Sequence, residues 1–300
     1  MNFTDKLNAL KKEKDVAILA HYYVDEEIQA LADYVGDSFY LAQKGRELTN
    51  KRIIMAGVYF MGETIKTLNP DKKVYNLNWL ADCPMAHMAN EKDIVDMRNK
   101  YDDLAVVTYV NSTIETKALS DVCVTSSNAA KICKKLKEKN IFFIPDKNLG
   151  AYVSEELPDK NFIFNKGACP RHNQISKEDL LALKDLHPRA KVLAHPECKR
   201  EVLDLSDYIG STKGIINEAS KSSADEFIVV TVKAIRYELE RLNPDKTFYF
   251  LDKLTCLNMN MHKKEDLLTC MDDPFNEVKI DEDLRQKALK PLERMLELGK

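Results

Sequence analysis

The stretch Asp33-Tyr-Val-Gly-Asp-Ser38 decides the fold, because its pattern returns twice further along the chain. The other two copies are Asp121-Val-Cys-Val-Thr-Ser126 and Asp207-Tyr-Ile-Gly-Ser-Thr212. Their first aspartates are 88 and 86 residues apart, a period long enough for a whole small domain. The sequence therefore predicts three similar units within one chain.

Two further features recur with each copy. A strand-like run ending in polar residues precedes it, and a cysteine follows it after two more strand-like runs. The three strand ends are Leu19-Ala-His21-Tyr-Tyr23, Thr108-Tyr-Val-Asn111 and Leu193-Ala-His195-Pro-Glu197. The cysteines are Cys83, Cys169 and Cys256, which are 86 and 87 residues apart. Three features that recur in one order at one spacing favour a true repeat over chance.

Short apolar runs alternate with helical stretches, as in parallel βαβ units. The clearest predicted strands are 16–20, 52–56, 104–110, 141–145, 191–194, 227–231 and 247–251, and predicted helices include 128–139, 177–186 and 280–298. This alternation predicts an α/β protein with parallel sheets. Because open parallel sheets place their ligands at the strand carboxyl ends, a pseudo-threefold arrangement of the three units would bring the polar residues and the cysteines around one central cavity. The predicted domains are 1–88, 89–174 and 175–264, with a C-terminal helical segment, 265–300, docking back on the first.

The composition is that of an ordinary globular protein. The 300 residues are 44% hydrophobic and 31% charged, with a formal net charge of −3. No basic tract interleaved with aromatic residues is present, so nucleic acid is not an expected partner. No signal segment and no uninterrupted apolar run of about 18 residues occurs, so we expect a cytoplasmic protein that binds no membrane.

The cysteines point to a metal centre. Seven is an odd number, and a reducing compartment does not favour disulfides. No Cys-x-x-Cys pair occurs, so ligands must come from distant parts of the chain. Three converging thiolates suit zinc or an iron-sulfur cluster, either of which would keep one coordination position open, and the spacing does not choose between them.

Hydroxyl residues at expected helix starts are candidates for anion binding. Ser38, Ser126, Ser211 and Thr212 occupy such positions in the three repeats. Backbone N–H groups with Ser or Thr hydroxyls bind phosphate or carboxylate there, although helix capping alone would also explain these residues.

The chain resembles the quinolinate synthase A family over nearly its whole length. The motifs that carry the resemblance are Gly36-Asp-Ser38, Gly57-Val-Tyr-Phe-Met-Gly-Glu63, Asp82-Cys-Pro-Met85, Tyr109-Val-Asn-Ser112, Thr125-Ser-Ser-Asn-Ala129, Pro145-Asp-Lys-Asn-Leu-Gly150, His195-Pro-Glu-Cys198, Gly210-Ser-Thr212 and Cys256-Leu-Asn-Met259. The resemblance implies three homologous three-layer α/β/α domains around a [4Fe-4S] cluster held by Cys83, Cys169 and Cys256. It thereby implies iron-sulfur rather than zinc.

The resemblance also implies a reaction of NAD biosynthesis. Iminoaspartate and dihydroxyacetone phosphate would condense to quinolinate with loss of phosphate and two waters, and an L-aspartate oxidase would be a functional partner. An open iron of the cluster would act as a Lewis acid. In this reading Glu197 is the base, and His21, Tyr23, Tyr109 and His195 are its hydrogen-bonding or proton-transfer partners. Ser38, Asn111, Ser126, Ser211 and Thr212 would bind substrate, with His172 near the cluster.

The sequence departs from the family pattern in three places. Tyr22 and Val24 flank Tyr23 where many members read His-Asn-Tyr-Gln, and Arg171 takes a usually apolar position. Val232 and Ala234 stand where members usually have Glu and Gly. These last two favour an alternative function, that of a weakly active or non-catalytic iron-sulfur binding or sensing homologue; a zinc-dependent hydrolase is a more distant alternative.

Overall fold

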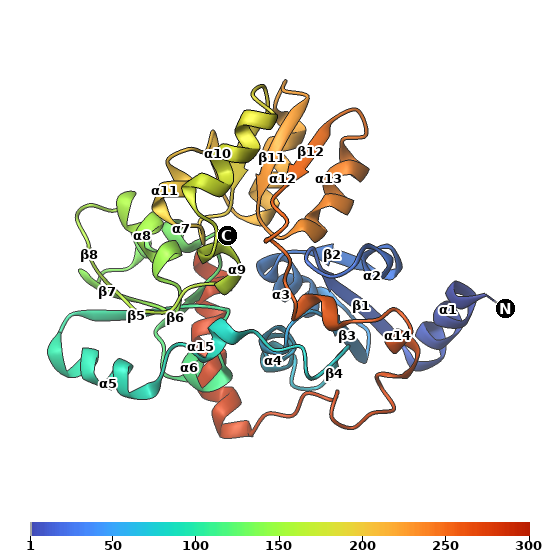
Figure 1. Cartoon of the computed structure of the whole chain (residues 1–300). Helices are drawn as coiled ribbons and strands as arrows, with labels where there is room; N and C mark the ends of the chain where they lie inside the picture. Colours follow the sequence, from blue (N-terminus) through green and yellow to red (C-terminus); the bar gives the residue numbers. More distant parts are fainter. Residues whose placement is uncertain (1) are drawn as a thin grey trace.

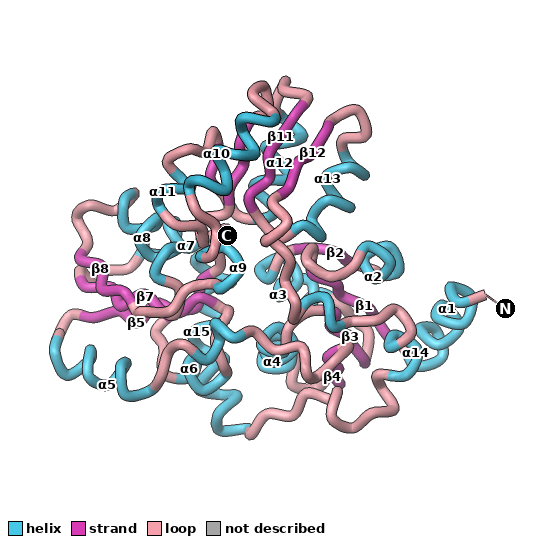
Figure 2. The backbone as a smooth tube through the Cα atoms, in the orientation of Figure 1, coloured by secondary structure: helices cyan, strands magenta, loops and turns pink. Residues whose placement is uncertain are grey.

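The computed structural model describes residues 2–300, which form three four-stranded parallel sheets interleaved with helices (Figure 1, Figure 2). The strands are β1 Val16–His21, β2 Tyr34–Gly36, β3 Arg52–Ala56, β4 Lys73–Asn76, β5 Leu104–Tyr109, β6 Val122–Val124, β7 Asn140–Ile144, β8 Asn161–Phe164, β9 Lys191–Ala194, β10 Tyr208–Ile209, β11 Glu226–Val230 and β12 Thr247–Phe250. The three sheets lie within the ranges 1–88, 89–174 and 175–264.

The helices connect these strands and cover the sheets. The α-helices are α1 Phe3–Lys14, α2 Glu26–Leu31, α3 Ser38–Glu47, α4 Tyr59–Leu68, α5 Glu91–Lys100, α6 Ile114–Ala118, α7 Ala129–Lys135, α8 Lys147–Glu155, α9 Pro170–Asn173, α10 Lys177–Leu186, α11 Arg200–Leu203, α12 Thr212–Lys221, α13 Arg236–Leu242, α14 Asp266–Thr269 and α15 Glu282–Leu298. Short 3-10 helices are η1 Pro84–His87, η2 Lys233–Ile235 and η3 Met259–Met261. Within residues 2–300, no helix is both long and apolar enough to span a membrane.

Each sheet has the same strand order. The orders are β2-β1-β3-β4, β6-β5-β7-β8 and β10-β9-β11-β12, with all pairs parallel. The chain therefore leaves the first strand of a repeat for one edge and then crosses to its other side. Such a topological switch opens a crevice at the strand carboxyl ends, where ligands bind. The predicted α/β class and threefold repeat are confirmed.

The repeated aspartate has a structural explanation. The Asp33 carboxylate accepts a hydrogen bond from the Ile18 N–H at 2.8 Å, while the Asp33 N–H donates to the Ile18 carbonyl. Asp121 and Asp207 make the same pair of bonds with the first strands of their own repeats, at Val106 and Val192. One carboxylate thus joins the edge strand to the central strand in all three units.

The third repeat shows why its strands are apolar on both faces. Ile228 and Val230 of β11 pack into a core with α10 and α11, whereas Phe227 and Val229 pack into a separate core with α12 and α13. Successive residues of a strand face opposite sides of the sheet, so both faces are covered and the unit has three layers.

The C-terminal segment crosses from the first repeat to the second. Val278 donates to the carbonyl of Val74 at 2.8 Å, which places this segment along the edge of β4. The helix α15 then packs against α6, β6 and α4, as Figure 1 shows in red. Leu292 and Met295 are fully buried there, and each contributes about 1.5 to 3 kcal/mol through burial of apolar surface.

The helix predicted over 128–139 is shorter in the structure, ending at Lys135. Leu136 takes an extended conformation and its side chain is buried, so the chain leaves the helix to pack this residue into the core. The lysine-rich composition of the segment favoured a longer helix. The end of the helix was misplaced because helix propensity does not include tertiary packing.

Candidate active site and metal centre

One cavity of about 130 Å³ gathers residues from all three repeats. Thirteen of the fourteen predicted site residues line it: His21, Tyr23, Ser38, Cys83, Tyr109, Asn111, Ser126, Cys169, His172, His195, Glu197, Thr212 and Cys256. The exception is Ser211, which faces an adjoining outer cavity and whose Oγ caps α12 by accepting from the Gly214 N–H at 3.1 Å.

The strand order explains this convergence. The first strand of each repeat ends at the cavity, and the polar residues His21, Tyr109 and His195 stand at or just after these ends. The neighbouring central strands also end close by, because Thr231 and Val232 follow β11. Most of the polar lining therefore comes from loops that begin at the switch point of each sheet.

Two of the three cysteines, those of the first two repeats, stand at equivalent local positions. Cys83 precedes η1 and Cys169 precedes α9, and a proline takes the first helical position after each. Proline suits that position because no backbone N–H, which proline lacks, is needed there, and because its φ is already helical. Cys256 lies in the loop before η3. All seven cysteines within residues 2–300 are free thiols.

Burial controls the state of these thiols. It raises the pKa of Cys83 to about 12 and raises the pKa of Cys169 and Cys256 as well. Without a metal the thiols stay protonated at neutral pH, so metal binding must release their protons. A ligand set of three thiols around one cavity fits a soft metal centre.

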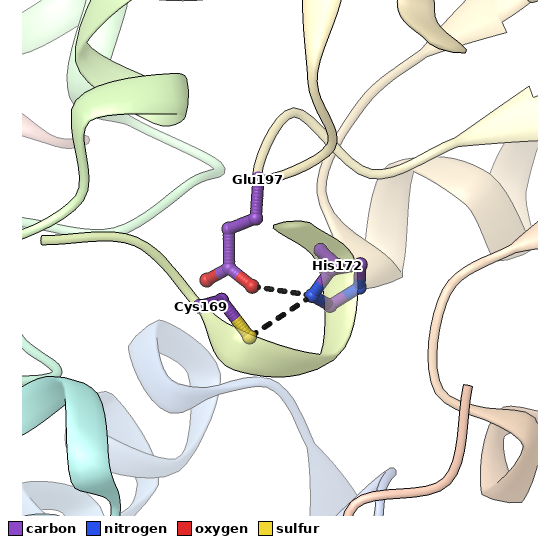
Figure 3. A group of neighbouring side chains, drawn as sticks. All are labelled: Cys169, His172 and Glu197. Carbon is purple, nitrogen blue, oxygen red and sulfur yellow. Dashed lines mark hydrogen bonds and ion pairs between the residues drawn. The ribbon is translucent and has the colours of Figure 1, made fainter. Parts of the chain in front are cut away.

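A second group of possible ligands includes one of these cysteines. Possible ligand atoms of Cys169, His172 and Glu197 all lie within 4.8 Å of one another, so this part of the cavity could hold a metal ion. Figure 3 shows that one ring nitrogen of His172 faces both the Glu197 carboxylate and the Cys169 sulfur. Its Nδ1 is 2.7 Å from Glu197 Oε2 and 3.2 Å from Cys169 Sγ.

Glu197 is a buried carboxylate that stays ionised. Its side chain is 5% exposed, and burial alone would raise its pKa. The neighbouring imidazoles of His195 and His172, with hydrogen bonds donated by His172 and Tyr109, outweigh burial and hold the pKa of Glu197 below its usual range. The structure therefore presents an ionised hydrogen-bond acceptor inside the cavity.

A chain of hydrogen bonds leads from Tyr23 to this carboxylate. The Tyr23 hydroxyl lies 2.7 Å from Thr231 Oγ1, which lies 2.9 Å from His172 Nε2. The opposite nitrogen of His172 bonds Glu197. Tyr23 also bonds Thr212 Oγ1 at 2.8 Å, so its hydroxyl is held from two sides.

Two further histidines are neutral. Burial lowers the pKa of His21 to about 3 and that of His195 to about 4. Nδ1 of His21 accepts the Tyr23 N–H at 3.1 Å, and Nδ1 of His195 accepts the Glu197 N–H at 3.3 Å. A neutral ring that accepts at Nδ1 carries its proton on Nε2. His195 Nε2 accordingly donates to Ser126 Oγ at 3.2 Å.

The helix-start hydroxyls divide into caps and cavity residues. The capping side chains of α3 and α12 are Asp37 and Ser211, one residue before Ser38 and Thr212. Ser38 and Thr212 are thus not required as caps, and both line the cavity. Capping alone does not account for them.

Sequence reasoning missed two residues that organise the site. Thr231 links Tyr23 to His172, and Asp146 accepts the Cys169 N–H at 2.8 Å while capping α8. Burial, and after it the charge of Glu197, raises the pKa of Asp146 to about 7. Each stands at or just after the end of a predicted strand, and that position was the available signal.

The structure also locates the departures from the family pattern. Val232 and Arg171 both line the cavity. Burial raises the pKa of Cys256, and the positive charge of Arg171 partly offsets this effect. Ala234 lies in η2, and the only non-glycine residue with positive φ within residues 2–300 is Asp15. Ala234 therefore meets no backbone angle that would demand glycine.

Fold and site together define an α/β protein of three repeats around a central site that is rich in thiols and able to hold metal. The family model described as quinolinate synthetase A protein matches residues 5–297. The chain belongs to this family of NAD-biosynthesis enzymes.

Proteins named quinolinate synthase are similar along their whole length. The one from Fusobacterium nucleatum is 55% identical over 295 residues, covering 98% of this chain and 99% of the relative. The one from Clostridium perfringens strain SM101 is 45% identical over 300 residues, covering 100% of both. The one from Clostridioides difficile is 44% identical over 299 residues, covering 99% and 98%.

Proposed function

We propose that this chain condenses iminoaspartate with dihydroxyacetone phosphate to give quinolinate, inorganic phosphate and two waters. The observation that carries the proposal is the meeting of three thiols, one ionised carboxylate and three hydroxyl residues in one cavity of a chain that belongs to this family. An L-aspartate oxidase in the same cytoplasm would supply iminoaspartate.

The cofactor in this proposal is a [4Fe-4S] cluster held by Cys83, Cys169 and Cys256. Three thiols on one cavity support it, since thiolates are the ligands of such clusters. When bound, the cluster supplies a Lewis acid at the iron that no cysteine holds. Glu197 is not a ligand in this proposal, because His172 and Tyr109 already bond its carboxylate.

Glu197 serves as the base. It is ionised and buried in the cavity wall, so it can take a proton from a substrate carbon or nitrogen within hydrogen-bond reach. The hydrogen bonds from His172 and Tyr109 fix its orientation and weaken its basicity. When a substrate group takes over the Tyr109 hydroxyl, the carboxylate loses one donor and its basicity rises.

The neutral histidines act as donors. His21 and His195 carry their protons on Nε2, and both rings line the cavity. They would donate to carbonyl or phosphate oxygens of the substrates. Because burial keeps both pKa values well below 7, the rings are neutral at pH 7 and act as hydrogen-bond donors, not as imidazolium acids.

The anionic groups of the substrates would bind to the hydroxyl residues. Ser38 and Thr212 open the ten-residue helices α3 and α12, where unpaired backbone N–H groups favour negative charge. Ser126 and Asn111 extend this lining from the second repeat. The three repeats would thus receive one phosphate and the carboxylates of iminoaspartate, while Ser211 only caps its helix.

The test is anaerobic purification followed by cluster and activity measurements. Cys83→Ala and Cys256→Ala should each lose the absorption near roughly 400 nm and the formation of quinolinate, because the cluster depends on complete thiolate ligation. Cys133→Ala is the matched control, since Cys133 is buried in α7 and does not line the cavity. Full cluster and turnover in both ligand variants would contradict the proposal.

Val232 favours a second candidate, an iron-sulfur homologue that binds or senses without turnover. Its side chain puts hydrocarbon on the cavity wall where the family pattern has an acid. A parent protein that holds four irons and forms no quinolinate would select this second function.

A further inference from the structure

Among residues 2–300, the largest fully buried side chain is a lysine. Lys117 on α6 is 0% exposed. Burying an ammonium is costly unless it is paired and hydrogen-bonded, and an apolar side chain of similar size would fill the same space without that cost. Packing alone therefore does not account for this charge.

The ammonium holds the loop that carries Asn111. Lys117 Nζ donates to the Ser112 carbonyl at 2.8 Å, and Ser112 follows Asn111 directly. On the other side of Asn111, the Val110 N–H donates to the Val124 carbonyl at 2.9 Å. Asn111 is thus fixed by a hydrogen bond on each side, while its side chain lines the cavity.

The same ammonium contacts the wall supplied by the first repeat. Its Nζ lies 5.1 Å from the centre of the Phe60 ring on α4, a cation-π distance, and Phe60 also lines the cavity. Glu63 lies further along α4, and its carboxylate, when ionised, raises the pKa of Lys117 against the lowering effect of burial. One side chain of the second repeat therefore braces cavity walls from two repeats.

We propose that Lys117 is a positioning residue of the reaction, which holds Asn111 and Phe60 in register for the substrate without touching it. This inference rests on the proposed function for its effect on turnover. Its mechanical part, the fixing of residues 110–113, is independent of what the cavity binds. The two parts are therefore measured separately.

The variant that tests it is Lys117→Met combined with Glu63→Gln, which removes the ammonium and leaves no unpaired carboxylate behind. The matched control is Glu63→Gln alone, which keeps the bond from Lys117 to Ser112. Amide hydrogen exchange over residues 110–113 should be at least tenfold faster in the double variant than in the control. Lys117→Gln with Glu63→Gln replaces the methionine version if that does not fold, because the shorter side chain does not reach Ser112.

Turnover provides the second readout. The double variant should lose on the order of tenfold in kcat/KM relative to the control, mainly through KM, with its cluster absorption intact. In an Asn111→Ala background the same replacement should have a smaller effect, because the part of its contribution that Lys117 makes through Asn111 is already lost.

Each outcome decides one part. Unchanged exchange in the double variant overturns the inference, and so does faster exchange with kcat/KM equal to that of the control. A parent that forms no quinolinate refutes the proposed function instead. Exchange then still decides whether Lys117 fixes the loop.

Discussion

Glu197→Gln is the sharpest perturbation of this site, because it keeps the shape of the side chain and removes its charge. A positioned base contributes typically about 10² to 10⁴ in rate, which corresponds to roughly 3 to 5 kcal/mol in the activation barrier. We expect quinolinate formation to fall by that factor. The effect should appear in kcat, since the carboxylate acts in proton transfer rather than in anchoring an anionic substrate.

The same change should leave the protein folded. The hydrogen bond between His172 and Glu197 is 2.7 Å long and charge-assisted, and replacing it with a neutral bond loses about 1 to 2 kcal/mol of the free energy of unfolding. Relief from burying a carboxylate offsets this loss. The net change should stay below about 2 kcal/mol, a shift of a few degrees in melting temperature.

The assay is anaerobic quinolinate formation together with the absorption of the cluster and the iron content. Glu238→Gln is the matched control, because Glu238 is also buried and hydrogen-bonded, here to Arg241, but does not line the cavity. Turnover within threefold of the parent would refute the assignment of the base. Loss of iron in Glu197→Gln would show instead that the carboxylate is a metal ligand in the group with Cys169 and His172.

Three further replacements test the surroundings of the site. Thr231→Val removes the hydroxyl between Tyr23 and His172 and should lower turnover by roughly tenfold with the cluster intact, since one positioned hydrogen bond is worth about 1 to 1.5 kcal/mol; parental turnover would show that this link is dispensable. Burial raises the pKa of Glu63 to about 7, so the folded protein retains this proton above the unfolded pKa and loses roughly 1 to 3 kcal/mol of stability between pH 5 and 8; urea unfolding should show this slope in the parent and a reduced slope in Glu63→Gln, and equal slopes would contradict it. Val232→Glu alone, without a change at residue 234, should raise quinolinate formation by restoring an acid to the cavity, and an unchanged rate with a full cluster would show that this protein works without it.

The central strands could be predicted from sequence because both of their faces are buried. β1 and β5 are buried at every position, so each reads as a continuous apolar run. Five edge strands, β2, β4, β6, β8 and β10, were not among the predicted strands. β8 is half exposed, and β10 has only two residues, so neither leaves a clear pattern. The ends of the central strands were nevertheless enough to place the cavity.

The connections inside the site were beyond the sequence. Thr231 and His172 are 59 residues apart and meet only because β11 and α9 are brought together by the fold. The burial of Lys117 was not predicted either, since its contact with the Phe60 ring comes from another repeat. Sequence periodicity shows which strand ends face the cavity, but hydrogen-bond partners depend on packing between repeats.

Threefold symmetry of the scaffold explains the cysteines but not the polar residues. The first strands deliver pairs of residues that are two positions apart, namely His21 and Tyr23, Tyr109 and Asn111, and His195 and Glu197. In each pair the second residue lies in the turn or bend that follows the strand, and both residues line the cavity. Three equal thiols suit a centre that needs three similar ligands, whereas condensing two different substrates needs a base at one point and donors at others. The repeats therefore keep the cysteine in common and differ in these pairs, so that only the third repeat supplies an acid from its first strand end.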